Sequence, residues 1–286
     1  MASSHTFIFN KSSVQFWEYG DASQPLLVMI HGFRGTHHGL QRIIDQLPGY
    51  HIIVPDLPGF GASEAFLEGE HSLTQYVAFL KAFLEHLNPN QPLVLVGHSF
   101  GSIITSHYAA LSPASIHQLV LINPIGAPAL EGPKAVMTRL AIFYYWLGRQ
   151  LPAHASHWWL SAPPIVKIMS VAMAKSKDAS MRRYIHQQHL THFSSFASPQ
   201  VVAEAFRTSV SHDVRQVAQK ITTPTLLIAG EQDDITPLSK QRELVAAMPN
   251  AVLKVIPSVG HLIHYETAEE AAQLIVDCIG APIPRS

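Results

Sequence analysis

A short apolar run that leads directly into a serine framed by two glycines constrains this chain more than any other feature. Residues 93–96 read Leu-Val-Leu-Val, residues 97–101 read Gly-His-Ser-Phe-Gly, and an amphipathic helical pattern over residues 100–111 follows at once. In such a strand–turn–helix the serine lies in a sharp turn with its hydroxyl above the sheet, and a side chain at either glycine would collide with the neighbouring strand or helix. The segment therefore predicts that Ser99 is an exposed nucleophile.

Short apolar runs bounded by glycine and proline alternate with helical patterns along much of the chain. This alternation is typical of βαβ units, and near-continuous hydrophobicity suits strands of a parallel sheet that are buried on both faces. The run at residues 14–19 alternates in character and predicts an antiparallel edge hairpin instead. The continuous runs occupy residues 26–30, 51–55, 93–96, 118–122, 225–229 and 251–256.

Two helices have recognisable beginnings. Ser72 with Gln75 has the pattern of a capping box, and Asn88-Pro89 ends the helix that follows. Thr267 with Glu270 predicts the same capping arrangement for the last helix.

Residues 125–214 break the alternation. They contain only helical patterns rich in aromatic residues and methionine, and roughly 90 residues are too many for a loop in a compact protein. We therefore expect a helical insertion into a core formed by residues 1–124 and 215–286. Most of its apolar side chains would form its own core, while others would line a pocket above Ser99. The candidates for contact with substrate are Tyr144, Tyr145, Trp146, Trp158 and Trp159.

Composition excludes several classes of protein. The 286 residues have a formal net charge of −1, without the basic stripe typical of a nucleic-acid-binding protein. Cys278 is the only cysteine, which excludes an intrachain disulfide and suits a reducing compartment. No apolar run reaches the roughly 18 residues of a membrane span, and residues 1–10 lack the pattern of a signal peptide. We expect a soluble, cytoplasmic protein.

The 18 histidines raise the question of a metal site. The tightest cluster is His186, His189 and His192, whose spacing drifts around a helix, and no cysteine or nearby carboxylate completes a ligand set. We interpret these three as a polar helix face and His37-His38 as a loop pair. We expect neither a metal nor another cofactor.

The remaining motifs resemble the α/β-hydrolase family, in which nucleophile, acid and histidine follow in that chain order. Gly260-His261 comes directly after the last apolar run, so the resemblance implies that His261 is the general base, with His264 as the alternative. Residues 230–237 resemble the family's G-x-x-D-x-x-x-P loop and imply that Asp233 is the acid. Asp234 is the alternative acid, because a slip of one residue in a loop would exchange the two. A further position used for the acid, at the end of the run before the insertion, holds Asn123.

The resemblance also implies an oxyanion hole, formed by backbone N–H groups aimed at the developing charge. One donor would be Phe100 at the start of its helix, where the helix dipole helps. The other would be Phe33, because residues 31–35 (His-Gly-Phe-Arg-Gly) are similar to the family's H-G loop. Arg34 is either a surface residue or a contact for substrate. Asp56 belongs to a D-x-x-G-x-G-x-S turn, and we interpret it as part of the scaffold.

The implied fold is α/β, with a mostly parallel sheet of roughly eight strands, helices on both faces and an all-helical cap inserted after the sixth strand. The implied activity is hydrolysis of a carboxylic ester through an acyl-enzyme on Ser99. Few basic residues cluster in 125–214, which favours a small to medium, mainly apolar ester over a highly charged one.

Other functions are open on this scaffold. Hydrolysis of a carbon–carbon bond in a ring-cleavage dienoate is the second hypothesis, although such enzymes usually have a Gly-Pro-Gly oxyanion loop, which residues 31–36 lack. Lactonase or thioesterase activity is chemically close to ester hydrolysis, and a non-catalytic ligand receptor is a third class. Apolar surface on the insertion would also suit a homodimer.

Overall fold

A computed structural model describes residues 2–89, 91–127 and 135–280 of the chain. It contains an eight-stranded sheet in the order β1-β2-β4-β3-β5-β6-β7-β8. The first two strands form an antiparallel hairpin, β2 pairs antiparallel with β4, and all other pairs are parallel, so the prediction of a mostly parallel sheet is confirmed. The strands are β1 (Ser3–Phe9), β2 (Ser12–Tyr19), β3 (Leu26–Ile30), β4 (His51–Pro55), β5 (Leu93–His98), β6 (Gln118–Ile122), β7 (Thr225–Gly230) and β8 (Ala251–Ile256).

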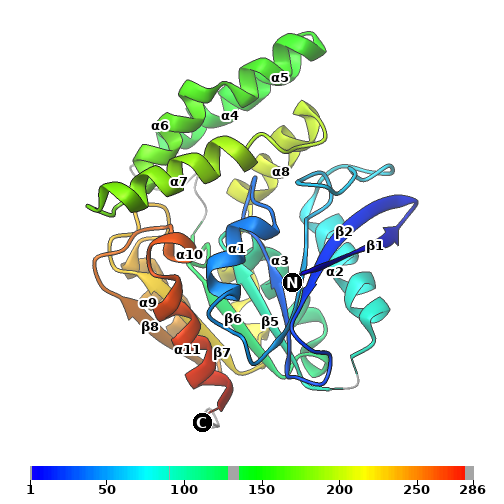
Figure 1. The fold of residues 1–286 in the computed structure, drawn as a ribbon, viewed down its shortest axis with the longest axis vertical. Helices are drawn as coiled ribbons and strands as arrows, with labels where there is room; N and C mark the ends of the chain where they lie inside the picture. Colours follow the sequence, from blue (N-terminus) through cyan, green and yellow to red (C-terminus); the bar gives the residue numbers. More distant parts are fainter. Residues whose placement is uncertain (1, 90, 128–134, 281–286) are drawn as a thin grey trace.

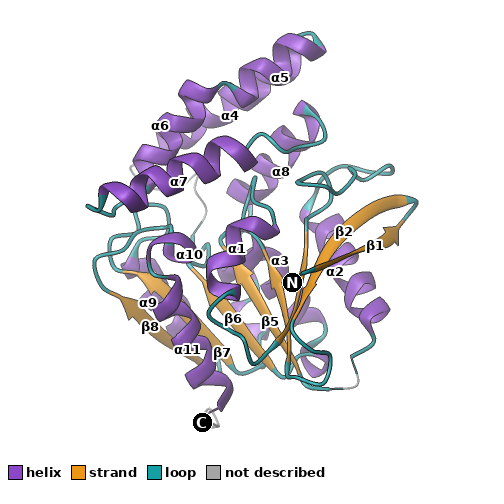
Figure 2. Cartoon of the chain, viewed as in Figure 1, coloured by secondary structure: helices purple, strands orange, loops and turns teal. Residues whose placement is uncertain are grey.

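Helices cover both faces of this sheet (Figure 2). In β3, Leu26 and Val28 pack into the core on one face, whereas Leu27 and Met29 pack into the core on the other. Successive side chains of a strand point to opposite faces, which is why a continuous apolar run marks a strand buried on both sides. One face is covered by α2 (Leu73–Leu87), α3 (Phe100–Leu111) and α9 (Leu238–Ala247), and the other by α1 (His37–Ile44) and α11 (Ala268–Gly280).

Among the described residues, five α-helices follow β6 and precede β7, and we refer to residues 135–211 as the helical segment. Figure 1 shows them stacked beyond one end of the sheet, with α7 and α8 nearer to the strands than α4 and α5. Among the residues that the structure describes, no helix is long and apolar enough to cross a membrane. The helices are α4 (Ala135–Gln150), α5 (Ala153–Ser161), α6 (Pro163–Met173), α7 (Ala179–His192) and α8 (Pro199–Ser211).

The helix ends match the sequence patterns only in part. The Ser72 side chain accepts a hydrogen bond from the Gln75 backbone N–H at 3.4 Å, as expected, but the Gln75 side chain donates to the Glu68 carbonyl instead of completing a capping box. The expected cap at Thr267 is wrong, because its hydroxyl is buried without a hydrogen-bond partner among the described residues. Thr267 also closes the short helix α10 (Ile263–Glu266), with ψ of 43°, and so lacks the extended backbone of an N-cap.

The aromatic cluster between the hairpin and α2 generates a prediction about stability. The Phe83 ring lies 5.2 Å from the ring of Phe16 and 5.6 Å from that of Phe7, and its side chain is fully buried. Phe83→Ala should lower the free energy of unfolding by about 3–5 kcal/mol through lost burial and the cavity that remains. Urea unfolding measures this loss, with Lys81→Ala as the control on the exposed side of the same helix. Similar losses in both variants would contradict the prediction.

Candidate active site

The turn between β5 and α3 holds Ser99 in a strained conformation. Ser99 has φ of 52°, a value that residues with side chains seldom adopt, and its backbone N–H donates to the Ile122 carbonyl at 3.0 Å. A Cβ atom at Gly101 would collide with the Ile30 carbonyl oxygen, and one at Gly97 would collide with the Thr105 hydroxyl. The two glycines therefore allow the close approach of helix and strands that presents the Ser99 hydroxyl at the end of the sheet.

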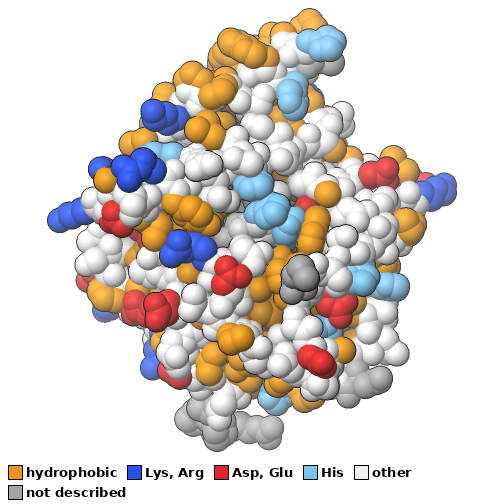
Figure 3. Space-filling view, viewed as in Figure 1, with side chains coloured by type: hydrophobic (Ala, Val, Ile, Leu, Met, Phe, Trp, Pro, Cys, Tyr) orange, Lys and Arg blue, Asp and Glu red, His pale blue; other side chains and the backbone are white. Residues whose placement is uncertain are grey.

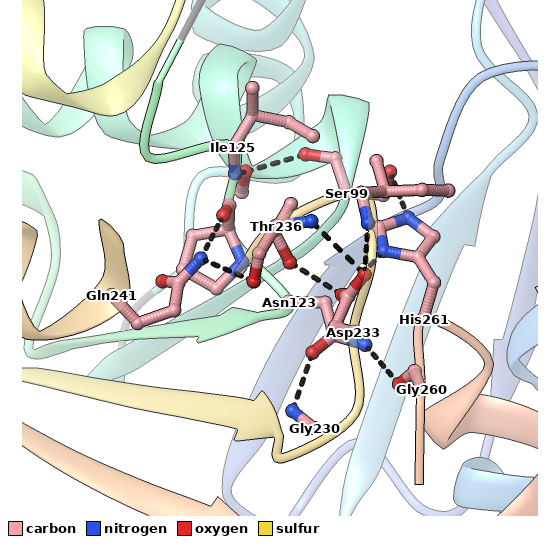
Figure 4. Close-up of polar contacts among 12 residues, drawn as sticks. Ser99, Asn123, Ile125, Gly230, Asp233, Thr236, Gln241, Gly260 and His261 are labelled. Carbon is pink, nitrogen blue, oxygen red and sulfur yellow. Dashed lines mark hydrogen bonds and ion pairs between the residues drawn. The ribbon is translucent and has the colours of Figure 1, made fainter. Parts of the chain in front are cut away.

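Ser99, His261 and Asp233 form a continuous chain of hydrogen bonds (Figure 4). His261 lies in the loop after β8, and its Nε2 atom is 2.8 Å from Ser99 Oγ. Its Nδ1 atom is 2.8 Å from Asp233 Oδ2 in the loop after β7. A carboxylate can only accept, so Nδ1–H donates to Asp233 and Nε2 is free to accept the Ser99 hydroxyl proton. This arrangement can activate the serine as a nucleophile.

The surroundings of Asp233 keep it ionised. Its Oδ1 atom accepts the backbone N–H groups of Ile235 and Thr236, at 2.7 and 3.0 Å, and its Oδ2 atom accepts the Thr236 hydroxyl at 2.5 Å. Burial acts to raise the pKa of Asp233, but attraction to His261 and the hydrogen bonds from His261 and Thr236 outweigh it and hold this pKa well below its usual value. The carboxylate can therefore orient His261 and stabilise a positive charge on it.

The structure places the two alternative residues elsewhere. The Asp234 side chain is 62% exposed and pairs with Lys175 Nζ at 2.5 Å. His264 is buried with its ring 4.2 Å from the ring of His98, and its Nδ1 atom has no hydrogen-bond partner among the described residues. Neither takes part in the hydrogen-bond chain that ends at Ser99.

Asn123 supports the site in a way that sequence reasoning missed. It follows β6 directly, and its side-chain amide donates to the Gly260 carbonyl at 3.2 Å and accepts from the Gly230 N–H at 2.9 Å (Figure 4). One buried side chain thus joins the loop that holds Asp233 to the loop that holds His261. Its place at the carboxyl end of a central strand was the available signal.

The loop after β3 lies against Ser99. A Cβ atom at Gly32 would lie 3.2 Å from Ser99 Cβ, and Phe33 and Phe100 line the same cavity as Ser99. His31 fixes this loop, because its Nδ1 atom donates to the Gly32 carbonyl at 2.8 Å while Nε2 accepts the Leu57 N–H at 2.9 Å. Phe100 is the first residue of α3, so its N–H is among the helix donors that have no partner within the helix.

A cavity of about 250 Å³ opens above Ser99 between the sheet and the helical segment. Of the five aromatic residues that we expected to contact substrate, the structure brings Tyr145 to its lining. Tyr144 and Trp159 bond to one another's backbone carbonyls, at 2.8 and 3.3 Å, and so pack α4 against α5. Trp146 and Trp158 are 49% and 68% exposed. These four lie outside the lining of this cavity.

Histidines gather where the helical segment meets α1, and Figure 3 shows them near the middle of this face. The expectation of a loop pair at His37-His38 is wrong, because both residues begin α1. Asp56 accepts the His37 backbone N–H at 2.7 Å and lies 3.0 Å from its Nδ1 atom. The His38 ring lies 4.4 Å from that of His192 on α7, so this contact joins α1 to the helical segment.

The expected polar face of α7 also needs correction. His189 is buried, and its Nδ1 atom lies 2.8 Å from the Ser170 hydroxyl, which also lies 2.7 Å from His186 Nδ1. His186 and His189 thus pack against α6, while His192 lies against His38 of α1. Among the described residues, no three histidine, cysteine or acidic side chains are grouped so that they would hold a metal ion.

Comparison with known proteins identifies the family. The family described as the alpha/beta hydrolase fold matches residues 25–268. The chain is 28% identical over 280 residues to the uncharacterized hydrolase YugF of Bacillus subtilis, covering 96% of each protein. It is 25% identical over 263 residues to Lipase 1 of Psychrobacter immobilis, covering 89% of this chain and 77% of the lipase. An esterase from Exiguobacterium antarcticum has the same fold, with a TM-score of 0.80 at 17% identity over 98% of this chain and 100% of the esterase. The chain belongs to the alpha/beta hydrolase fold family and is a hydrolase of that fold.

The two hydrogen bonds of Asn123 generate a second prediction. Asn123→Ala should lower the free energy of unfolding by about 1–3 kcal/mol, because the Gly230 N–H and the Gly260 carbonyl would be buried without their partner. Alanine also suits a left-handed backbone less well than asparagine, so Asn10→Ala is the matched control. Asn10 has φ of 47°, close to the 44° of Asn123, but its side chain is exposed. Equal losses of stability on urea unfolding would show that the side-chain bonds of Asn123 contribute nothing.

Proposed function

We propose that this protein hydrolyses a carboxylic ester of a small to medium, mainly apolar molecule through an acyl-enzyme on Ser99. The observation that carries the proposal is the unbroken hydrogen-bond chain from Asp233 through His261 to Ser99, at 2.8 Å for each step. It lies at the floor of a cavity whose walls are largely apolar. The similarity to Lipase 1 of Psychrobacter immobilis adds support.

In the first half of the proposed reaction, Ser99 Oγ attacks the ester carbonyl carbon as His261 Nε2 takes the hydroxyl proton. The carbonyl oxygen becomes negative and accepts hydrogen bonds from the backbone N–H groups of Phe33 and Phe100. Collapse of this intermediate breaks the bond to the alcohol, which leaves with the proton from His261. Asp233 holds the imidazole in the required tautomer and stabilises its charged form.

In the second half, water takes the place of the alcohol. His261 removes a proton from the water, whose oxygen attacks the acyl carbon bound to Ser99. The acid leaves and Ser99 regains its proton from His261. The two halves add up to ester and water giving acid and alcohol, with no other reactant consumed.

We further propose that residues 125–214 form a cap that shapes the substrate cavity. The helical segment contributes lining residues from four of its helices, including Tyr145 of α4, Met169 of α6, His189 of α7 and Phe206 of α8. Residues 128–134 of this proposed cap lie outside the described residues.

The mechanism predicts large losses of activity from single substitutions. Ser99→Ala and His261→Ala should each lower kcat for p-nitrophenyl butyrate by several orders of magnitude, because nucleophile and base act as a unit. Asp233→Asn should lower it by about 10²–10⁴-fold, since an amide does not hold the required tautomer of the histidine. Release of p-nitrophenol, followed over many turnovers by absorbance, measures each effect.

The matched control is Asp234→Asn, which makes the same chemical change on an exposed neighbour and should leave kcat within about twofold. Retained activity in Ser99→Ala would contradict the nucleophile. A larger loss in Asp234→Asn than in Asp233→Asn would reassign the acid. A wild-type burst that stops after one equivalent would contradict an enzyme that turns over esters.

The size of the cavity predicts the preferred chain length. Among p-nitrophenyl esters, kcat/KM should be higher for butyrate or hexanoate than for palmitate, because a cavity of about 250 Å³ encloses only short chains. Tyr145→Ala should move the optimum toward longer acyl chains by enlarging the cavity. Leu140→Ala removes an exposed side chain from the same helix and should leave the optimum in place. An optimum at palmitate in the wild type would contradict this assignment of the cavity.

A further inference from the structure

The cavity above Ser99 has two chemically different walls. One wall is apolar: the Phe33 ring lies 5.8 Å from the ring of Tyr145 and 5.5 Å from that of Phe206. The other wall is a run of ring contacts from Phe193 through His189 and Tyr265 to His264 and His98, with successive ring centroids 4.2–5.6 Å apart. Arg34 lies over the Phe193 ring at the end of this second wall.

Arg34 is held in place by backbone carbonyls while one of its nitrogens stays unused. Its side chain is 1% exposed, and it lines the cavity. Its Nε atom donates to the Phe193 carbonyl at 2.8 Å and its Nη2 atom donates to the Leu160 carbonyl at 2.9 Å. Its Nη1 atom is buried with no hydrogen-bond partner among the described residues. Burying a guanidinium N–H group without an acceptor costs free energy. This cost would be offset if a ligand in the cavity accepted a hydrogen bond from Nη1.

No counter-charge faces Arg34 from the described lining of the cavity, which contains neither aspartate nor glutamate. Four histidines of this lining, His31, His98, His189 and His264, do not add positive charge near neutral pH. Burial lowers the pKa of His98 and of His189 to about 3, and it also lowers the pKa of His31 and His264. Arg34 is therefore the fixed charge of the cavity lining, and an anion brought by a ligand would offset the cost of its burial.

Thr36 supplies a second unused donor beside Arg34. It occupies the N-cap position of α1 with an extended backbone, where a threonine hydroxyl normally accepts a hydrogen bond from the helix. Here the hydroxyl makes no capping bond and is buried without a partner among the described residues, although Thr36 also lines the cavity. Two polar groups from one loop thus lack partners in the same cavity.

We propose that the substrate carries a carboxylate, which binds Arg34 Nη1 and the Thr36 hydroxyl while its apolar part packs against Phe33, Tyr145 and Phe206. This inference rests on the proposed function and names the substrate class of the same site: an ester, mainly apolar, with one acidic group. The unused Nη1 and hydroxyl donors match the two oxygens of a carboxylate. One fixed positive charge likewise matches one negative charge.

The test compares acid with amide in two matched pairs of esters. The first pair is mono-p-nitrophenyl glutarate and its glutaramate analogue, which place the group on the acyl part. The second pair is 4-carboxyphenyl butyrate and 4-carbamoylphenyl butyrate, which place it on the alcohol part. In the wild type, kcat/KM should be about tenfold or more higher for the acid than for the amide in at least one pair. A ratio near one in both pairs would overturn the proposal.

Three variants locate the effect. Arg34→Met should abolish the preference for the acid, and Thr36→Val should reduce it by several-fold without removing the bonds to Leu160 and Phe193. Arg34→Lys should retain part of the preference, because the charge remains. Arg207→Met removes an exposed positive charge next to Phe206 and should leave the ratio unchanged. If Arg34→Met lowers kcat/KM equally for the acid and the amide, Arg34 only holds the loop and the helices together, and the proposal is wrong.

A binding measurement separates this inference from the proposed function. Calorimetry with Ser99→Ala, which does not depend on hydrolysis, should show tighter binding of 4-carboxyphenyl butyrate or monoethyl glutarate than of the matching amide. The added substitution Arg34→Met should remove the difference. Hydrolysis of neutral esters without any such preference would overturn the carboxylate site alone. Binding that depends on Arg34, with no ester turned over by the wild type, would instead overturn the proposed function and leave the anion site standing.

Discussion

The close approach of α3 to the ends of β3 and β5 is the constraint on which the site depends. At Gly101 the helix passes so near the Ile30 carbonyl that no side chain fits, and at Gly97 the strand passes equally near Thr105. Within this approach Ser99 has a positive φ of 52°, and its N–H bonds to the Ile122 carbonyl of the next strand. The packing of α3 against the sheet thus stabilises the strained backbone of Ser99. Strain of this kind persists in a folded protein only where the surrounding structure compensates for its energy.

The electrostatics of the site separate one histidine from its neighbours. The His98 ring lies 5.6 Å from the ring of His261 and 4.2 Å from that of His264, yet burial lowers the pKa of His98 and His264 so that these two stay neutral. Of these three histidines, it is His261 that hydrogen-bonds to the carboxylate of Asp233. A proton released by Ser99 therefore has one favourable acceptor, and the surrounding imidazoles contribute polarizable, uncharged walls.

Local pattern predicted most of the strands and Ser99, and the resemblance to the family added His261 and Asp233, which the structure joins to Ser99 by hydrogen bonds. These residues occupy strand ends and glycine-marked turns, where short-range sequence determines position. Contacts between distant segments were beyond such reasoning, as the bonds of Asn123 to the loops after β7 and β8 illustrate. The residues of the helical segment that line the cavity were harder to predict, because aromatic composition does not say which side of a helix faces the site. Tyr145 and Trp146 are neighbours in the sequence, but only Tyr145 is on the side of α4 that lines the cavity.

One loop links the chemistry of the site to its shape. Phe33, whose N–H we propose as an oxyanion donor, packs its ring against Tyr145 and Phe206 of the helical segment. The next residue, Arg34, adopts a left-handed backbone and bonds to carbonyls of α5 and of the residue that follows α7. A displacement of these helices therefore acts directly on the loop that lies against Ser99. The substrate contacts and the oxyanion donors that we propose therefore belong to a single packed unit.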